Sequence, residues 1–270
     1  MPEVELKPCF LAPTRVQPEY PLFVYLPGMD GTGQLLRSQT SGLEVAFDVR
    51  CFAIPRKDLT SWDVLSDSVL DLIHAELEKS SQRPVYLCGE SFGGCLAMKV
   101  AIKAPQLFER IILINPASSF QLLPWLNWAS LVTQWVHPCL YDLGALALLP
   151  FLASLPRISR SDRQELLKNM RSVPPETVLW RLSLIKEFNV DPQHLRSLTQ
   201  PVLLLGSASD QLLPSVTEVN RLANILPNAK TLVLPYSGHA CLLEKEINLY
   251  EIMAKHDFLQ NTYELLTYSP

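Results

Sequence analysis

One short segment limits the fold of this chain more than any other. The apolar run Val85–Cys88, typical of a buried strand, leads directly into Gly89-Glu90-Ser91-Phe92-Gly93 and then into a helical pattern. So sharp a turn from strand to helix needs glycines where backbone segments pass closely, and it forces the residue at its apex into strained dihedrals. Ser91 would then present its hydroxyl at the sheet edge, beside a helix N-terminus that favours negative charge. The segment predicts an α/β sheet and favours Ser91 as a nucleophile over an ordinary glycine- and serine-rich turn.

Elsewhere, short β-rich apolar runs alternate with helical patterns, which is typical of a mostly parallel sheet with crossover helices. Trp62–Leu77, for example, has apolar residues at helical spacing. The predicted strands are Leu22–Leu26, Val49–Ile54, Val85–Cys88, Ile111–Asn115, Pro201–Leu205 and Lys230–Leu234, and the predicted helices are Trp62–Leu77, Phe92–Ile102, Val216–Leu226 and Ile247–His256.

The alternation stops between Asn115 and Pro201, where the chain is helical in pattern and rich in Leu, Trp and Pro. An insertion between two strands of such a series would form a helical cap over the carboxyl ends of the strands, where open α/β sheets bind ligands. We therefore expect an α/β core made of residues 1–118 and 200–270, with residues 119–199 as a cap inserted before the strand that precedes Asp210.

An acid and a histidine follow Ser91 in the order that a serine nucleophile on a strand-to-helix turn requires. Asp210 comes after the predicted strand Pro201–Leu205, and His239 after the next one, so both lie on loops at the same sheet edge. His239 would take the proton of Ser91, and Asp210 would fix the imidazole tautomer. The alternatives are a helix-capping aspartate and a surface-loop histidine, and the order and spacing favour the catalytic interpretation.

The glycine-rich run Leu26-Pro-Gly-Met-Asp-Gly-Thr-Gly33 follows the first strong strand. Acyl transfer needs two backbone N–H groups aimed at a developing oxyanion, and we expect them from Phe92 and Met29. A plain turn is the alternative, and the role of Asp30 stays open. The run has neither the G-K-[ST] ending of a phosphate loop nor the dinucleotide fingerprint, so no cofactor and no metal are expected.

Composition sets limits on compartment and partners. The 270 residues fit one domain with an insertion, and a net charge of −4 argues against nucleic-acid binding. Six cysteines form no C-x-x-C pair, which favours a reducing, cytoplasmic compartment. Met1–Phe10 does not resemble a secretory signal, and Leu140–Leu155 is shorter than the roughly 20 residues of a membrane span. We expect a soluble or peripheral protein; no oligomeric state is indicated.

The cap segment Pro124–Leu155 is unusually apolar, and two interpretations stay open. It could be a small helical core, or it could line a tunnel for an acyl or isoprenoid chain; its tryptophans would also suit docking on a membrane surface. The basic segment Arg157–Arg171 favours a solvated helix face over a lipid-headgroup contact. The candidate substrate-binding residues are Trp125, Trp128, Trp135, Leu149 and Phe151.

Three motifs together resemble one family: Leu26–Gly33, Leu87-Cys-Gly-Glu-Ser-Phe-Gly-Gly-Cys95 and Asn115-Pro-Ala-Ser118. They are similar to the hydrolase part of the phytyl ester synthase/diacylglycerol acyltransferase-like proteins of plastids and cyanobacteria. The resemblance implies an α/β-hydrolase fold, the same three catalytic residues and lipophilic esters of phytol or glycerol as substrates. Plant members continue into an acyltransferase-like domain, whereas this sequence ends at Pro270, which favours hydrolysis over ester synthesis. We expect hydrolysis of a lipophilic carboxylic ester through an acyl-enzyme; the alternatives are acyl transfer to an alcohol, a thioesterase, or a non-catalytic binding protein.

Overall fold

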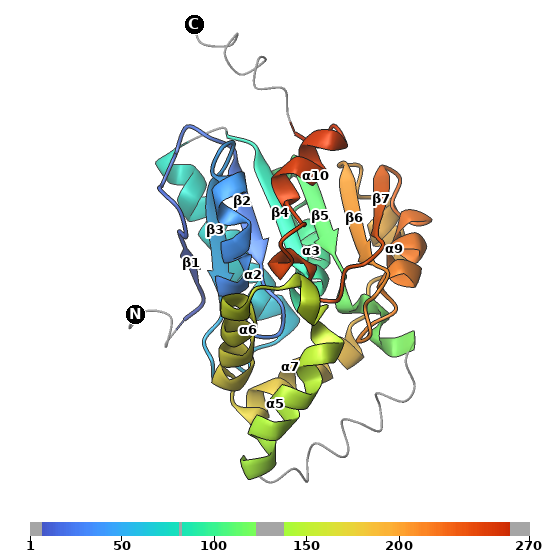
Figure 1. Cartoon of the computed structure of the whole chain (residues 1–270). Helices are drawn as coiled ribbons and strands as arrows, with labels where there is room; N and C mark the ends of the chain where they lie inside the picture. Colours follow the sequence, from blue (N-terminus) through green and yellow to red (C-terminus); the bar gives the residue numbers. More distant parts are fainter. Residues whose placement is uncertain (1–6, 81–82, 123–137, 260–270) are drawn as a thin grey trace, which may run out of the picture.

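A seven-stranded sheet forms the centre of the molecule in the computed structural model, which describes residues 7–80, 83–122 and 138–259 (Figure 1). The strand order is β1-β3-β2-β4-β5-β6-β7, and every neighbouring pair is parallel except β1 with β3. This confirms the mostly parallel α/β sheet that the sequence predicts. The strands are β1 (Cys9–Leu11), β2 (Leu22–Leu26), β3 (Asp48–Ala53), β4 (Val85–Glu90), β5 (Arg110–Ile114), β6 (Val202–Ser207) and β7 (Ala229–Leu234).

Helices cover both faces of the sheet, because successive side chains of a strand point to opposite faces. In β2, Leu22, Val24 and Leu26 pack into one apolar core, and Phe23 and Tyr25 into the other. The first core is completed by α2 (Trp62–Lys79), α3 (Phe92–Lys103) and α9 (Ser215–Ala223), and the second by α1 (Thr40–Leu43) and α10 (Leu249–Lys255).

The edge strand β1 is an element that the sequence patterns do not predict. It has three residues, Cys9–Leu11, and pairs antiparallel with β3. Pro8 and Pro13 stand close to its two ends, and a run of three residues is too short to display an alternating pattern. The remaining strands lie where they are predicted, with ends that differ by one or two residues.

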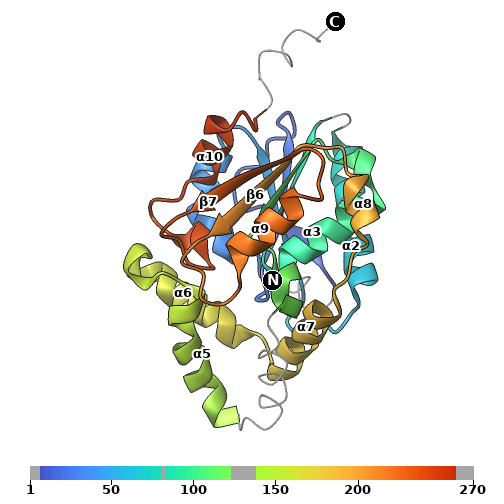
Figure 2. The same ribbon diagram turned by 90° about the vertical axis from the view of Figure 1, so that its right-hand side faces the viewer.

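The described chain between β5 and β6 consists of helices joined by short loops, and α5, α6 and α7 gather at one end of the sheet (Figures 1 and 2). Trp125, Trp128 and Trp135 fall outside the described residues, and the division into core and cap stays a prediction. Within the described ranges, no helix combines the length and apolar character that a membrane crossing requires. The elements are η4 (Ala117–Leu122), α5 (Pro138–Leu152), η5 (Leu155–Arg157), α6 (Arg160–Ser172), α7 (Pro175–Glu187) and α8 (Pro192–Arg196).

A buried ion-pair network ties β3 to its neighbours at the amino end of the sheet. Asp48 has a side chain with no exposed surface and lies 2.7 Å from Arg50 and 2.6 Å from Arg83. Glu76 of α2 lies 2.8 Å from Arg50. Burial raises the pKa of Asp48, but hydrogen bonds from Arg50 and Arg83 outweigh it, and the net pKa lies below its ordinary value. The pKa of Glu76 is lowered in the same way, with burial opposed by Lys79 and Arg50.

We expect Asp48→Asn to lower the free energy of unfolding at neutral pH by about 3 kcal/mol, because it leaves buried guanidinium groups without their counter-charge. Asp48 binds protons less readily in the folded state, so its stabilising effect is present above an ordinary pKa of about 4 and is lost as the pH falls through the folded-state value. Denaturant titrations between neutral and acidic pH should therefore give a flatter dependence for the variant. Asp67→Asn, which removes the exposed partner of Lys103, is the matched control and should cost less than about 1 kcal/mol. Equal losses in the two variants would contradict the prediction.

Candidate active site

Ser91 occupies the strained turn that the sequence predicts between β4 and α3. Its backbone adopts φ 54° and ψ −114°, in a region that non-glycine residues rarely visit. The turn is held by the Ser91 N–H, which donates to the Ile114 carbonyl at 3.0 Å. Gly93 is required by close packing, since a Cβ there would lie 2.0 Å from the Leu26 carbonyl oxygen. Ser91 therefore stands at the carboxyl ends of the central strands.

His239 and Asp210 meet Ser91 at this edge. His239 Nε2 lies 2.8 Å from Ser91 Oγ, and His239 Nδ1 lies 2.7 Å from Asp210 Oδ2. Asp210 is on the loop after β6 and His239 on the loop after β7, so residues that are distant in sequence come within hydrogen-bonding reach. The imidazole is buried, with 4 % of its residue surface exposed. This geometry is the one that nucleophilic catalysis by a serine requires.

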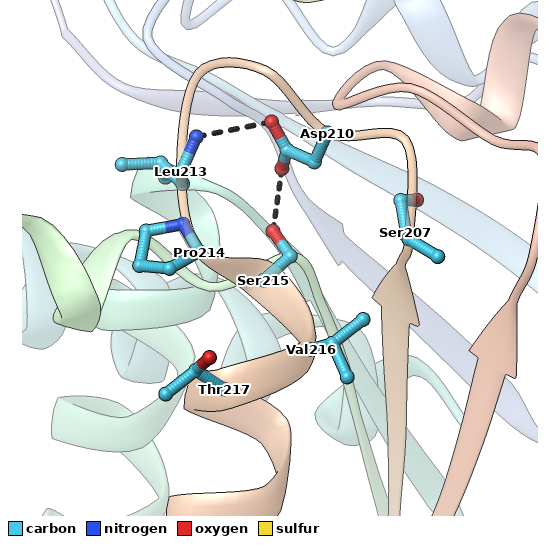
Figure 3. Close-up of a pocket in the computed structure, with 8 residues that line it drawn as sticks. Ser207, Asp210, Leu213, Pro214, Ser215, Val216 and Thr217 are labelled. Atoms are coloured by element: carbon cyan, nitrogen blue, oxygen red, sulfur yellow. Dashed lines mark hydrogen bonds between the residues drawn. The ribbon is translucent and has the colours of Figure 1, made fainter.

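The carboxylate of Asp210 is held by four donors that fix its orientation. Oδ1 accepts from the backbone N–H of Leu212 at 2.8 Å and of Leu213 at 3.0 Å. Oδ2 accepts from Ser215 Oγ (Figure 3), and the same oxygen faces His239 Nδ1. Asp210 also lines a pocket of about 210 Å³ between the end of β6 and the start of α9. Because Oδ1 is committed to the backbone, Oδ2 is the oxygen that accepts the hydrogen bond from the imidazole.

Charge pairing determines the ionisation of the two residues. Burial raises the pKa of Asp210, but the charge and hydrogen bond of His239 and the bonds from Ser215 and Leu213 outweigh it, so the net pKa is lowered. Burial lowers the pKa of His239, and here Asp210 and Glu90 outweigh it, so the net pKa is raised. Asp210 is thus ionised at neutral pH, and the imidazole is a stronger base than in water.

The glycine-rich loop after β2 lies next to the serine, because Leu26 at the end of β2 is paired with Gly89 of β4. A Cβ on Gly28 would lie 3.8 Å from the Cβ of Ser91, so the neighbouring Met29 is close to the serine as well. Phe92 is the first residue of α3, where the backbone N–H has no partner within the helix. The roles of Met29 and Phe92 as oxyanion donors remain predictions that this placement favours.

Two side chains hold that loop in place. Arg181 of α7, 2 % exposed, donates to the Met29 carbonyl at 2.6 Å and to the Pro55 carbonyl at 3.2 Å. Asp30 accepts from the Thr32 hydroxyl and, at 3.0 Å, from the Thr32 backbone N–H. Asp30 therefore orients the loop internally, and Arg181 ties it to α7.

A second carboxylate, Glu90, lies beneath the histidine. It accepts a hydrogen bond from the buried Tyr25 hydroxyl. Burial raises the pKa of Glu90 to about 7, although the Tyr25 hydrogen bond and the charge of His239 lower it. A partly ionised Glu90 contributes to the raised pKa of His239. In the sequence, Glu90 occupies the variable second position of the G-x-S-x-G motif, and no pattern indicates that it contacts Tyr25 or influences His239.

This arrangement leads to an expected pH dependence. His239 must be neutral to act as a base, so kcat/KM should fall as the pH drops through its pKa, above the ordinary value of about 6.5. Glu90→Gln removes a charge that raises this pKa, and we expect the acidic limb of the profile to move to lower pH. Tyr25→Phe should move it in the same direction, because losing the hydrogen bond raises the pKa of Glu90 and leaves it neutral. Initial rates across the pH range would measure both shifts; an unchanged or upward-shifted limb in Glu90→Gln would count against the coupling.

The two predicted substrate-binding residues that the structure describes, Leu149 and Phe151, differ in their burial. Leu149 is buried in a small cluster with Ala153, Leu166 and Ala240, and Ala240 directly follows His239 in the sequence. Phe151, by contrast, has 49 % of its surface exposed. Substrate binding by either residue stays a prediction. In the basic segment, Arg160, Lys168 and Arg171 are exposed, as a solvated helix face requires. Arg157 differs, because it pairs with the buried Glu244 at 2.6 Å.

Asn115 is a site residue without an assigned role in the sequence, although it opens one of the motifs quoted above. Its side chain accepts from the Ser207 N–H at 2.8 Å and donates to the His239 carbonyl at 2.7 Å. It adopts φ 43°, a conformation that asparagine tolerates better than most residues. Asn115 thus links the loops of Asp210 and His239.

The described residues hold no group of three or more His, Cys, Asp or Glu placed to bind a metal ion.

Known proteins resemble the chain in both sequence and fold. Phytyl ester synthase 1, chloroplastic, from Arabidopsis thaliana is 34 % identical over 255 residues, covering 86 % of this chain and 36 % of its own length. Phytyl ester synthase 2, chloroplastic, from the same plant is 28 % identical over 259 residues, covering 86 % of this chain and 37 % of its own length. The chain thus spans about a third of the length of these relatives.

The fold is shared with solved structures. A hydrolase from Oleispira antarctica superposes with a TM-score of 0.74 at 17 % identity, covering 96 % of each chain. The model of the family described as alpha/beta hydrolase fold matches residues 45–246, which include the serine turn, the Asp210 loop and the His239 loop. This match covers well over half of the sequence, and the chain belongs to the α/β hydrolase family.

Proposed function

We propose that this protein is a serine hydrolase that cleaves a lipophilic carboxylic ester through a covalent acyl-enzyme. The observation that carries the proposal is the hydrogen-bonded series Ser91–His239–Asp210, with 2.8 Å and 2.7 Å between its members. The strained Ser91 turn and the adjacent glycine-rich loop support it, since they are the other two parts that acyl transfer by a serine needs.

In the acylation step, Ser91 Oγ attacks the ester carbonyl while His239 Nε2 takes its proton. The imidazolium that forms is stabilised by Asp210, which also keeps the Nδ1 proton in place. The backbone N–H groups of Phe92 and Met29 receive the negative charge of the tetrahedral oxygen. Collapse of the intermediate breaks the bond to the alcohol, which leaves with the proton from His239.

In the deacylation step, water gives its proton to His239 and attacks the acyl-enzyme, and the acid leaves as Ser91 recovers its proton. An alcohol in place of water would give a new ester, and the names of the two plant relatives favour this as the second candidate. The same three residues serve both reactions, so the outcome depends on which acceptor reaches the acyl-enzyme.

Two observations favour a lipophilic substrate. The relatives are named for esters of phytol, a long apolar alcohol. In addition, Leu146, Leu148 and Phe151 of α5 each expose at least 41 % of their surface, so the cap presents apolar side chains outward. Contact with a membrane surface through α5 belongs to the same proposal, and co-sedimentation with phospholipid vesicles, compared with a Leu146→Ser/Phe151→Ser variant, would test it.

A panel of p-nitrophenyl esters of increasing chain length tests the proposed activity. We expect kcat/KM to rise from acetyl toward long acyl chains, because longer chains bury more apolar surface. Analysis of the products with and without phytol separates the candidates: free acid in both cases supports hydrolysis, whereas phytyl ester supports acyl transfer. Acyl thioesters, assayed in parallel, identify a thioesterase. Failure to cleave any of these substrates or to react with a fluorophosphonate probe would overturn the proposal in favour of a non-catalytic protein.

A further inference from the structure

The loop that carries His239 runs beside a segment of the cap. The N–H of Ala240 donates to the Leu152 carbonyl at the end of α5, at 2.7 Å, and Ile158 pairs with Glu244 in an antiparallel bridge. The N–H of Lys245 donates to the Arg157 carbonyl at 3.1 Å. Backbone contacts at both ends therefore join residues 152–158 to residues 240–245.

The contact is closest at the residue before His239. A Cβ placed on Gly238 would lie 2.6 Å from the Ser154 nitrogen and 3.2 Å from the Ala153 Cα. Two backbones that approach this closely leave no room for a side chain at position 238. The cap thus lies against the backbone from which the imidazole projects.

Glu244 connects this backbone to a charge in the cap. Its side chain has no exposed surface. Oε1 accepts from the Gly238 N–H at 2.8 Å, and Oε2 accepts from Ser237 Oγ at 3.0 Å and from Arg157 Nε at 2.6 Å. A carboxylate buried in this way needs a partner of opposite charge, and Arg157 supplies it from the cap.

We propose that Arg157 is a positioning residue for His239. Arg157 pairs with Glu244 and holds it in place, Glu244 fixes the Gly238 N–H and the Ser237 hydroxyl, and the imidazole is thereby held on Ser91 Oγ. On the other side, Asn115 holds the His239 carbonyl at 2.7 Å, so the backbone is fixed both before and at the histidine. The inference rests on the proposed function, because it concerns the base of that reaction.

Arg157→Gln, Arg157→Lys and Glu246→Gln test the proposal with p-nitrophenyl acetate and a long-chain p-nitrophenyl ester. Arg157→Gln should lower kcat for both esters by about 10- to 100-fold with little change in KM, because a displaced base slows the chemical step and not binding. Arg157→Lys should recover most of the activity by restoring a cation beside Glu244. Glu246→Gln is the matched control: it removes the exposed partner of the same arginine, 2.6 Å from Nη2, and should leave kcat unchanged.

The double variant Arg157→Gln/Glu244→Gln places neutral groups at both positions, and it replaces Arg157→Gln if that protein does not fold. It should lose about as much kcat as Arg157→Gln, since the two residues act in series. A normal kcat in Arg157→Gln, a loss confined to the long-chain ester or a change confined to KM would each overturn the proposal. Ser91→Ala in the same assays distinguishes failure of this inference from failure of the proposed function. An inactive Ser91→Ala beside a normal Arg157→Gln refutes only this inference. An active Ser91→Ala refutes the proposed function.

Discussion

Asp210→Asn is expected to lower kcat by about 10⁴-fold while the protein stays folded. The reason lies in the hydrogen bonds of the carboxylate. Oδ1 receives the N–H groups of Leu212 and Leu213, so the oxygen of an asparagine would take that place and its NH₂ group would face His239. The imidazole would then have to accept at Nδ1 and carry its proton on Nε2, where it cannot take the proton of Ser91.

Steady-state kinetics with a p-nitrophenyl ester measure this loss, with thermal unfolding as the check on folding. Ser215→Ala is the matched control, because it removes one donor to the same carboxylate and leaves the tautomer of His239 unchanged. We expect it to lose far less activity than Asp210→Asn. A loss of less than tenfold in Asp210→Asn would mean that another residue supplies the acid.

Ser91→Ala is expected to lower kcat by at least about 10³-fold and to abolish labelling by a fluorophosphonate probe. Without the hydroxyl, no acyl-enzyme can form, and the remaining rate would come from binding and from the oxyanion donors alone. The alanine keeps a Cβ at the strained turn, so the backbone of β4 and α3 should be preserved.

Cys95→Ala is the control for this prediction. Cys95 lies one turn further along α3, and burial raises the pKa of its thiol well above the ordinary value, which makes it a poor nucleophile. We expect its replacement to leave labelling and kcat within a few-fold of the wild type. Loss of labelling in Cys95→Ala together with retention in Ser91→Ala would assign the nucleophile to the cysteine.

The sheet and the three side chains of Ser91, Asp210 and His239 could be predicted from the sequence. Each is marked either by a short local pattern or by its order along the chain. Parallel strands buried on both faces are nearly continuous apolar runs in the sequence, as Val85–Cys88 of β4 shows. Ser91 lies in a five-residue motif, and Asp210 and His239 follow successive strands in the expected order. Their proximity follows from topology, since the carboxyl ends of parallel strands meet at one edge.

The residues that support the site could not be predicted, because their contacts link distant segments without a local pattern. Arg157 and Glu244 are 87 positions apart, and Arg181 and Met29 are 152 apart. In the sequence, Arg157 belongs to a basic stretch that favours a solvated surface, and only the antiparallel contact with the His239 loop brings it to a buried carboxylate. Asn115 lies in a recognisable motif, but its bonds to Ser207 and His239 depend on how three strands end.

The bond between Arg181 and the Met29 carbonyl bears on any attempt to redesign this protein by exchanging segments. The helix that carries Arg181 would be replaced together with the rest of the insertion in a chimera built on this core. Such a chimera needs a hydrogen-bond donor at the same place. Among the hydrogen bonds of the described residues, the one from Arg181 is the only bond from α7 to the Met29 carbonyl, and the glycine-rich loop would lose it. Because Met29 is a predicted oxyanion donor, we expect turnover to fall in such a chimera, so the segment between β5 and β6 cannot be exchanged independently of the glycine-rich loop.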